Sequence, residues 1–280
     1  MNKNYQYKPF QFFIIAYSLT WTTWFIAAYF SLQSGKDGLQ MLFMSFGLFA
    51  PAIATLYMYF SSGSRKLKAD FWNRIIQIRR IKWEYMPYVI LLMPVVIIFS
   101  ILISVLFGMP IQQLHLAKEF KIINGKFMLN MLIVFLAPAL EDLAWRGYGM
   151  DSIRSKFNML PATIYFSILW ALWHLPLFFI KGYYHNNLWN TSIIYVVNFF
   201  VSVLPLTIIM NWLYYRNNRS ILVCVIFHIM AVLSSEMFQI EEMTKCVVTG
   251  VMLVISMIII ITNDDLFFSQ KKTFKEIDSR

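Results

Sequence analysis

Residues 129–150 read LNMLIVFLAPALEDLAWRGYGM, and this stretch decides the fold class. Its first half is apolar enough to enter a bilayer, yet Glu141, Asp142 and Arg146 follow before the hydrophobic run ends. Ionisable side chains at membrane depth cost at least about 2.5–3.5 kcal/mol each on insertion scales, so they rarely lie there without a partner or a function. The stretch therefore predicts a membrane-spanning helix that carries functional polar groups.

The two acids of this helix are expected to have different partners. Asp142 and Arg146 are four residues apart with the acid first, which is the favourable order for an ion pair on one helix face. Glu141 is turned by about 100° from Asp142 and points away from that pair. We expect Glu141 to be the carboxylate that is left for chemistry.

The composition extends this class to the whole chain. Apolar residues make up 59% and charged residues only 14%, far below the roughly 25% of a soluble domain. The net charge of +10 reflects loop cations near lipid headgroups, so we expect the bilayer as a partner and no nucleic acid. The sequence predicts an all-α polytopic membrane protein, a single membrane domain over residues 1–280.

Apolar runs near the roughly 20 residues of a spanning helix recur along the chain. The predicted spans, about eight in number, cover residues 9–32, 39–61, 85–107, 127–149, 159–180, 189–212, 220–236 and 246–262. Residues 62–83 mix basic and apolar side chains, which suits either an amphipathic segment on the membrane surface or an ordinary cytoplasmic loop.

The Lys and Arg side chains predict the orientation of these spans. With eight spans, 18 of the 24 basic residues fall on the side of the termini and six on the other side. Because cytoplasmic loops carry the excess of positive charge, both termini are expected to be cytoplasmic.

Few other polar groups lie inside the predicted spans. His174 lies in the fifth span and His228 in the seventh, while Asn198 interrupts the sixth. A lone histidine in a bundle is more often a hydrogen-bonded packing residue, but two histidines and a spare glutamate on three helices favour a shared site. His115 and His185 fall in predicted loops, and we expect both to be solvated.

Glu141, His174 and His228 together suit proton transfer to and from water, as in amide hydrolysis. A carboxylate removed from bulk water becomes an effective general base near neutral pH, and a histidine can orient the water or donate to an oxyanion. The alternative is a zinc site with His174, His228 and Glu141 as ligands. The chain has no HExxH pair. If Glu141 were a zinc ligand, Asp142 would have to serve as the base, although it is expected to pair with Arg146. The sequence therefore slightly favours a metal-free site.

Three ordered motifs resemble a known family. EDLAWRG at 141–147 is similar to the EExxxR motif of the CPBP family, the CAAX-protease and bacteriocin-processing intramembrane proteases also called Abi or type II CAAX prenyl endopeptidases. WALWH at 170–174 resembles its second motif, with Trp170 in place of the usual Phe. FHIMAV at 227–232 resembles its third motif, and the similarity covers residues 128–235.

The resemblance implies an eight-helix bundle with an active-site cavity inside the membrane, open toward the cytoplasm. It implies that Glu141 and His174 activate water and that His228 helps to bind the oxyanion, with Asp142, Arg146 and Trp170 in support. The chain departs from the family at Asp142, where a glutamate is usual, and at Val232, where an asparagine is usual. The second change removes a polar group that would assist His228.

These observations favour an intramembrane endopeptidase of the bacterial cytoplasmic membrane that cuts a peptide or a membrane-associated protein. The resemblance implies bacteriocin self-immunity or peptide processing rather than prenylated substrates. The alternative, supported by Val232, is a non-catalytic immunity or scaffold protein that binds a peptide or a partner membrane protein. A transporter is disfavoured because repeated halves and paired broken helices are not found in the sequence.

Overall fold

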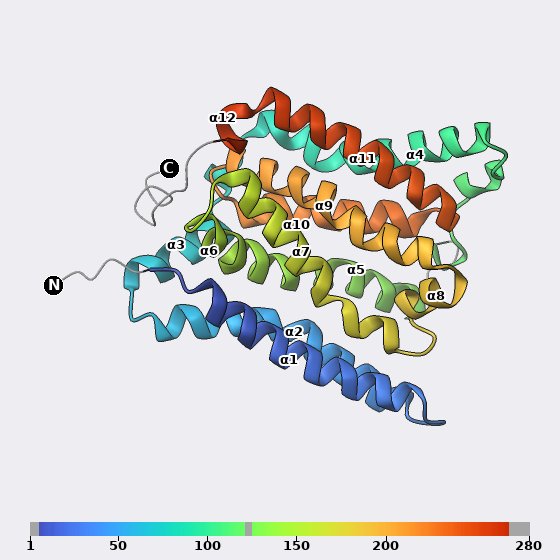
Figure 1. The fold of residues 1–280 in the computed structure, drawn as a ribbon, viewed down its shortest axis with the longest axis horizontal. Helices are drawn as coiled ribbons and strands as arrows, with labels where there is room; N and C mark the ends of the chain where they lie inside the picture. The colour runs from blue at the N-terminus through green and yellow to red at the C-terminus, as the bar shows by residue number, and fades with distance from the viewer. Residues whose placement is uncertain (1–5, 121–124, 269–280) are drawn as a thin grey trace.

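The computed structural model describes residues 6–120 and 125–268 of the chain. Regular structure in these two ranges is helical, apart from an isolated bridge between Leu116 and Phe238 (Figure 1). The predicted all-α class is therefore confirmed. The prediction that both termini are cytoplasmic depends in part on the basic residues of the tail from Lys271 onward. This tail lies outside the described residues.

Twelve α-helices make up most of the described chain. They are α1 (Pro9–Ser31), α2 (Asp37–Ser61), α3 (Arg65–Ile76), α4 (Met86–Leu106), α5 (Gly125–Ala144), α6 (Met150–Arg154), α7 (Met159–Trp173), α8 (Tyr184–Thr191), α9 (Ile193–Arg216), α10 (Ile221–Met237), α11 (Glu242–Thr262) and α12 (Asp264–Phe267). Short 3₁₀ segments are η1 (Ile78–Arg80), η2 (Trp83–Tyr85), η3 (Ile111–Leu114), η4 (Lys118–Phe120) and η6 (Leu175–Phe179), and η5 (Trp145–Gly149) is a π-helix.

Seven helical segments of the described residues are long and apolar enough to cross a membrane. The seventh predicted span, 220–236, corresponds to α10, which is apolar but has 17 residues and falls just short of that length. The predicted span at 189–212 is misplaced by four residues at each end. Ser192 separates α8 from α9 because its hydroxyl accepts a hydrogen bond from the amide of Ile194 and so caps the new helix.

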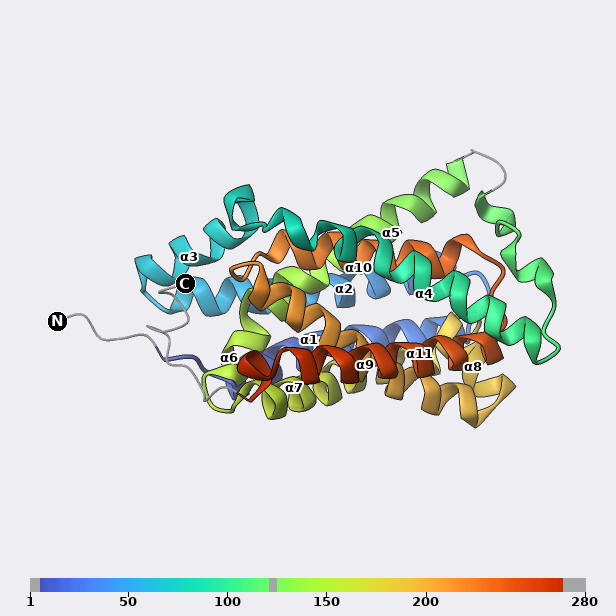
Figure 2. The same ribbon diagram turned by 90° about the horizontal axis from the view of Figure 1, so that it is seen from above.

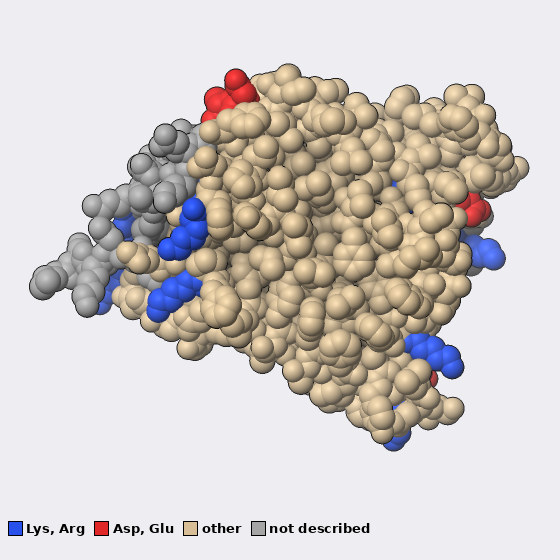
Figure 3. Space-filling model, in the orientation of Figure 1, with Lys and Arg blue, Asp and Glu red and all other residues tan. Residues whose placement is uncertain are grey.

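The long helices run along one axis of the molecule in a bundle. The α1–α2 hairpin lies on one side, α4 and α11 lie on the other, and α5, α7, α9 and α10 fill the space between them (Figure 1). The view from above shows the same parallel arrangement (Figure 2). On the face seen in Figure 3, charged side chains lie near the two ends and the broad middle has none, as expected for a surface in contact with lipid.

The predicted fourth span is not a continuous α-helix. It runs from Phe127 to Arg154 as α5, then the π-helix η5, then α6. In η5 the amide of Met150 bonds the carbonyl of Trp145, five residues back, which widens the turn. Gly147 in this turn permits a close approach of α3, since a Cβ there would lie 3.0 Å from the ring of Phe71.

Candidate active site

The ion pair predicted within α5 and η5 is present and fully buried. Arg146 Nη1 donates to Asp142 Oδ1 at 2.8 Å, and neither side chain is exposed. The Arg146 guanidinium also lies 4.8 Å from the centre of the Trp170 ring. A buried ion pair needs such additional contacts to offset the desolvation of its charges.

Glu141 faces α7 rather than Arg146, as its helical position predicts. The indole Nε1 of Trp170 donates to Glu141 Oε2 at 3.0 Å. The carbonyl of the same tryptophan accepts a hydrogen bond from His174 Nδ1 at 2.9 Å. Trp170 thus joins Glu141 and His174 through its two ends, one by the side chain and one by the backbone.

His174 lies where α7 changes into the 3₁₀ segment η6, with Pro176 two residues further on. Because a carbonyl can only accept, the bond to Trp170 requires the proton of a neutral His174 to be on Nδ1. Its Nε2 then carries a lone pair that can accept a proton. In this tautomer Nε2 is the nitrogen that can act as a general base.

His228 contacts Asp142 rather than Glu141. Its Nδ1 lies 3.2 Å from Asp142 Oδ2, and its ring packs edge-on against Trp170 at 5.5 Å between centroids. Asp142 therefore accepts from Arg146 with one oxygen and from His228 with the other. The sequence motif predicts the first contact by spacing, but the second joins α5 to α10.

The structure thus gathers the predicted residues around Trp170, from α5, α7 and α10. Within the described chain no direct hydrogen bond joins Glu141 to either imidazole. In the same part of the chain, no three side chains of His, Cys, Asp or Glu lie together as a metal-ligand group. The zinc alternative with Glu141, His174 and His228 gains no support from this geometry and stays a prediction.

His185 and Tyr183 are neighbours of the site that the sequence did not indicate. The prediction that His185 is solvated is wrong: it is 7% exposed and stacks on His174 with 5.7 Å between centroids, while His115 is exposed as expected. Burial in this aromatic surrounding lowers the pKa of His185 well below its usual value. Little in the sequence indicates that His185 is buried, because α8 is a short helix between two spans.

Tyr183 also stacks on His185, with 5.6 Å between ring centroids. Burial, together with the charges of Glu141 and Glu236, raises the pKa of Tyr183 to about 12. The start of α8 therefore covers the His174 side of the cluster with two uncharged rings.

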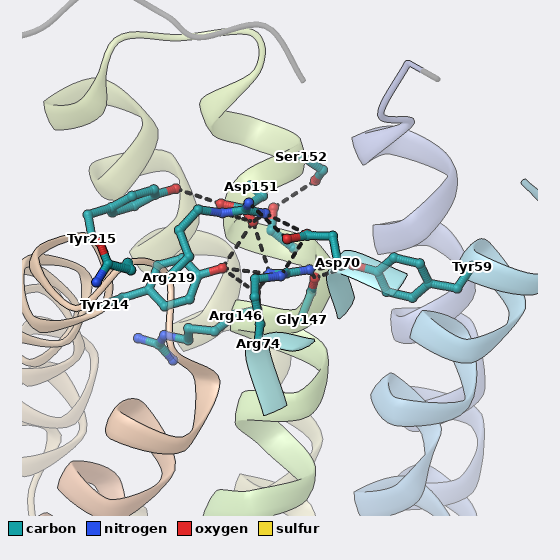
Figure 4. Close-up of polar contacts among 12 residues, drawn as sticks. Tyr59, Asp70, Arg74, Arg146, Gly147, Asp151, Ser152, Tyr214, Tyr215 and Arg219 are labelled. Atoms are coloured by element: carbon teal, nitrogen blue, oxygen red, sulfur yellow. Dashed lines mark hydrogen bonds and ion pairs between the residues drawn. The ribbon is translucent and has the colours of Figure 1, made fainter. Parts of the chain in front are cut away.

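A second polar cluster holds the π-helix that follows Asp142 (Figure 4). Arg74 of α3 is fully buried and donates to the carbonyls of Arg146 at 3.0 Å and Gly147 at 2.8 Å. Its guanidinium also contacts Asp151 Oδ2 at 3.0 Å. Figure 4 shows the Arg146 side chain directed away from Arg74, so its backbone and its guanidinium belong to different clusters.

Arg219, in the turn between α9 and α10, completes the second cluster. It lies 2.6 Å from Asp151 Oδ2 and 3.1 Å from Asp70 Oδ2. Burial alone would raise the pKa of the Asp70 carboxyl, but the charges of Arg74, Arg219 and Arg80 together hold it below its usual value. This cluster ties α3, η5, α6 and the α9–α10 turn together at one end of the bundle.

The fold and these buried groups define a class: a multi-pass helical membrane protein with a Glu–Trp–His cluster inside its bundle. The sequence profile of the family described as "Type II CAAX prenyl endopeptidase Rce1-like" matches residues 123–234. The "CAAX prenyl protease 2" of Methanococcus maripaludis is 37% identical over 270 residues, which cover 96% of this chain and 99% of the relative. The chain belongs to the type II CAAX prenyl endopeptidase family, a family of membrane proteases.

Proposed function

We propose that the chain is an intramembrane endopeptidase in which Glu141 and His174 activate a water molecule for attack on a peptide carbonyl. The observation that carries the proposal is the double contact of Trp170, which orients the Glu141 carboxylate and fixes the His174 proton on Nδ1. Both acceptors then belong to one rigid unit, and such preorganised groups supply most of the rate in comparable enzymes.

In the proposed reaction the water oxygen forms a bond to the scissile carbonyl carbon as its proton passes to Glu141 or to His174 Nε2. The carbonyl oxygen becomes an oxyanion, and the same proton then reaches the leaving nitrogen as the carbon–nitrogen bond breaks. His228 is proposed to help bind the oxyanion, and the contact of its Nδ1 with Asp142 Oδ2 at 3.2 Å orients the ring for that role.

The substrate is proposed to be a peptide or a membrane-associated protein that enters the bundle from the cytoplasmic side. The resemblance favours bacteriocin self-immunity or peptide processing in a bacterial cytoplasmic membrane, and the name of the Methanococcus maripaludis relative favours a prenylated C-terminus. Cleavage of matched peptides with and without a C-terminal prenyl group distinguishes these two substrates. Reporter domains fused to each terminus test the proposed cytoplasmic location of both.

The decisive experiment compares wild-type protein with Glu141→Gln in reconstituted vesicles, using mass spectrometry of the peptide products. We expect cleavage to disappear, because a neutral amide cannot accept the proton of the attacking water. Glu242→Gln is the matched control, since Glu242 pairs with Lys245 at 2.7 Å outside the site and should keep full activity. Cleavage by Glu141→Gln at the wild-type rate would refute the role assigned to Glu141. The absence of cleavage by the wild-type protein would favour the non-catalytic alternative that Val232 suggests.

A further inference from the structure

The helix α3 has two faces of opposite character. Its buried side chains include Leu67, Asp70, Phe71 and Arg74. Its exposed side chains include Arg65, Ala69, Trp72 and Ile76, spaced three or four residues apart along one face. The exposed face thus presents a large aromatic and an aliphatic side chain to the surroundings, although a soluble helix would present polar groups there.

The segment after α3 continues the exposed face. Ile78, Arg79, Lys82 and Trp83 are exposed, and Trp83 is 69% exposed at the point where the next candidate span begins. Within the described residues, Arg65, Arg79 and Lys82 form no ion pair. Tryptophan, isoleucine and unpaired cations on one surface are the composition of segments that lie in the headgroup region of a membrane.

The position of α3 in the bundle agrees with this composition. α3 follows the end of α2 and precedes the span that starts at Trp83, and it lies at the same end of the molecule as α6 and α12 (Figure 1). The span α2 and the span that starts at Trp83 therefore reach the membrane surface on either side of α3 in the chain. The exposed apolar residues of α3 are then at the level where lipid headgroups give way to acyl chains.

The buried face holds α3 in one orientation. Arg74 and Asp70 form ion pairs with Asp151 and Arg219, and Arg74 also donates to two carbonyls of η5. These contacts come from three other parts of the chain (Figure 4). Because they are buried and directional, the outward face cannot rotate without breaking them.

We propose that the basic interfacial surface, formed by Arg65, Trp72, Ile76, Arg79, Lys82 and Trp83, binds the headgroups of anionic phospholipids. The three cations attract the phosphate charge, and the aromatic and aliphatic side chains enter the acyl boundary. Each cation near an anionic membrane surface adds roughly a fivefold preference for anionic over neutral lipid, which corresponds to about 1 kcal/mol. This proposal is independent of the proposed protease mechanism.

The experiment places a fluorophore on Ala69→Cys, which lies between Arg65 and Trp72 on the exposed face of α3, and measures its quenching by brominated lipids. Cys246→Ser removes the half-exposed native thiol, while Cys224 is buried and does not react in the folded protein. Full-length protein is reconstituted in equal parts of phosphatidylcholine and phosphatidylglycerol, with one lipid brominated at a time. The ratio of the two quenching constants gives the preference at this site.

We expect phosphatidylglycerol to be preferred by at least fivefold in the parent protein, and expect Arg65→Gln/Arg79→Gln/Lys82→Gln to reduce that ratio toward one. The matched control is Lys36→Gln/Lys118→Gln/Lys181→Gln, which removes the same charge from exposed positions in other loops and should leave the ratio unchanged. A parent ratio near one, or an equal fall in both triple variants, overturns the proposal. Equal quenching by both lipids would show apolar anchoring without headgroup binding.

Discussion

Replacement of Arg74 by methionine tests whether the second polar cluster supports the bundle. The substitution keeps an unbranched side chain but removes the guanidinium donors to Gly147, Asp151 and Tyr59. The carbonyl of Gly147 keeps the hydroxyl of Tyr59 as a donor. The main loss is therefore one buried positive charge beside two carboxylates.

The structure sets the size of the expected effect. Removing one partner of a buried ion pair costs about 3–5 kcal/mol, because the other charge stays buried without compensation. Asp151 keeps Arg219 at 2.6 Å and the Tyr215 hydroxyl at 2.9 Å, so the lower end of that range applies. A loss of about 3 kcal/mol lowers the unfolding midpoint by roughly 6–12 °C at about 2–4 °C per kcal/mol.

Cys224 provides the assay for this prediction. Its thiol is buried in the folded protein, so a thiol-reactive fluorophore reports unfolding of the purified protein in detergent as the temperature rises. Cys246→Ser in every variant removes the signal from the second cysteine. Unfolding midpoints of Arg74→Met and of the parent are compared at equal protein and detergent concentrations.

Arg216→Met is the matched control. Arg216 also pairs with an aspartate, Asp265, but the two side chains are 26% and 64% exposed. An exposed pair contributes about 0–1 kcal/mol, so its loss should shift the midpoint by no more than roughly 4 °C. Equal shifts for Arg74→Met and Arg216→Met would refute the stabilising role assigned to the buried cluster.

Three further outcomes are expected. Asp142→Asn leaves Arg146 and His228 beside a neutral amide, and we expect the cleavage rate to fall about 100-fold, the equivalent of about 3 kcal/mol. A wild-type cleavage rate in vesicles would contradict the role of Asp142. Val232→Asn places a polar group one turn after His228, and we expect kcat to rise by at least about tenfold, since an oxyanion donor is worth about 10²–10³ in rate. An unchanged kcat would show that this position does not reach the oxyanion. The lowered pKa of Asp70 contributes stability that is complete above its unfolded value of about 3.9 and is lost as the pH falls through the folded value, so the unfolding midpoint should drop more steeply in acid for the parent than for Asp70→Asn.

Local spacing predicted the parts of the site that lie within one helix. Asp142 and Arg146 pair because residues four apart meet on any α-helix, and the turn into the π-helix does not separate them. Glu141 faces another helix for the same reason. Contacts between helices, such as Asp142 with His228, depend on packing angles that the spacing of one helix does not contain.

The errors have a similar cause. Arg74 counts as one of seven cations in a surface segment when the sequence is read alone, yet the structure buries it against η5. His185 lies in a polar stretch, YYHNN, and is buried because α8 folds back onto His174 and Phe199. A polar residue between two spans can face either water or the bundle, and local composition does not distinguish them.

The sequence by itself determined that this chain is a helical membrane protein, because bilayer thickness and the cost of unpaired backbone groups leave long apolar runs no other regular structure except a closed barrel. It also determined that Glu141, His174 and His228 lie inside apolar runs, where each carries a large transfer cost. Only the tertiary structure decided that Trp170 joins Glu141 to His174, that Asp142 orients His228, and that Arg74 holds the π-helix. Those contacts form between side chains far apart in the chain, and their geometry exists only once the helices have packed.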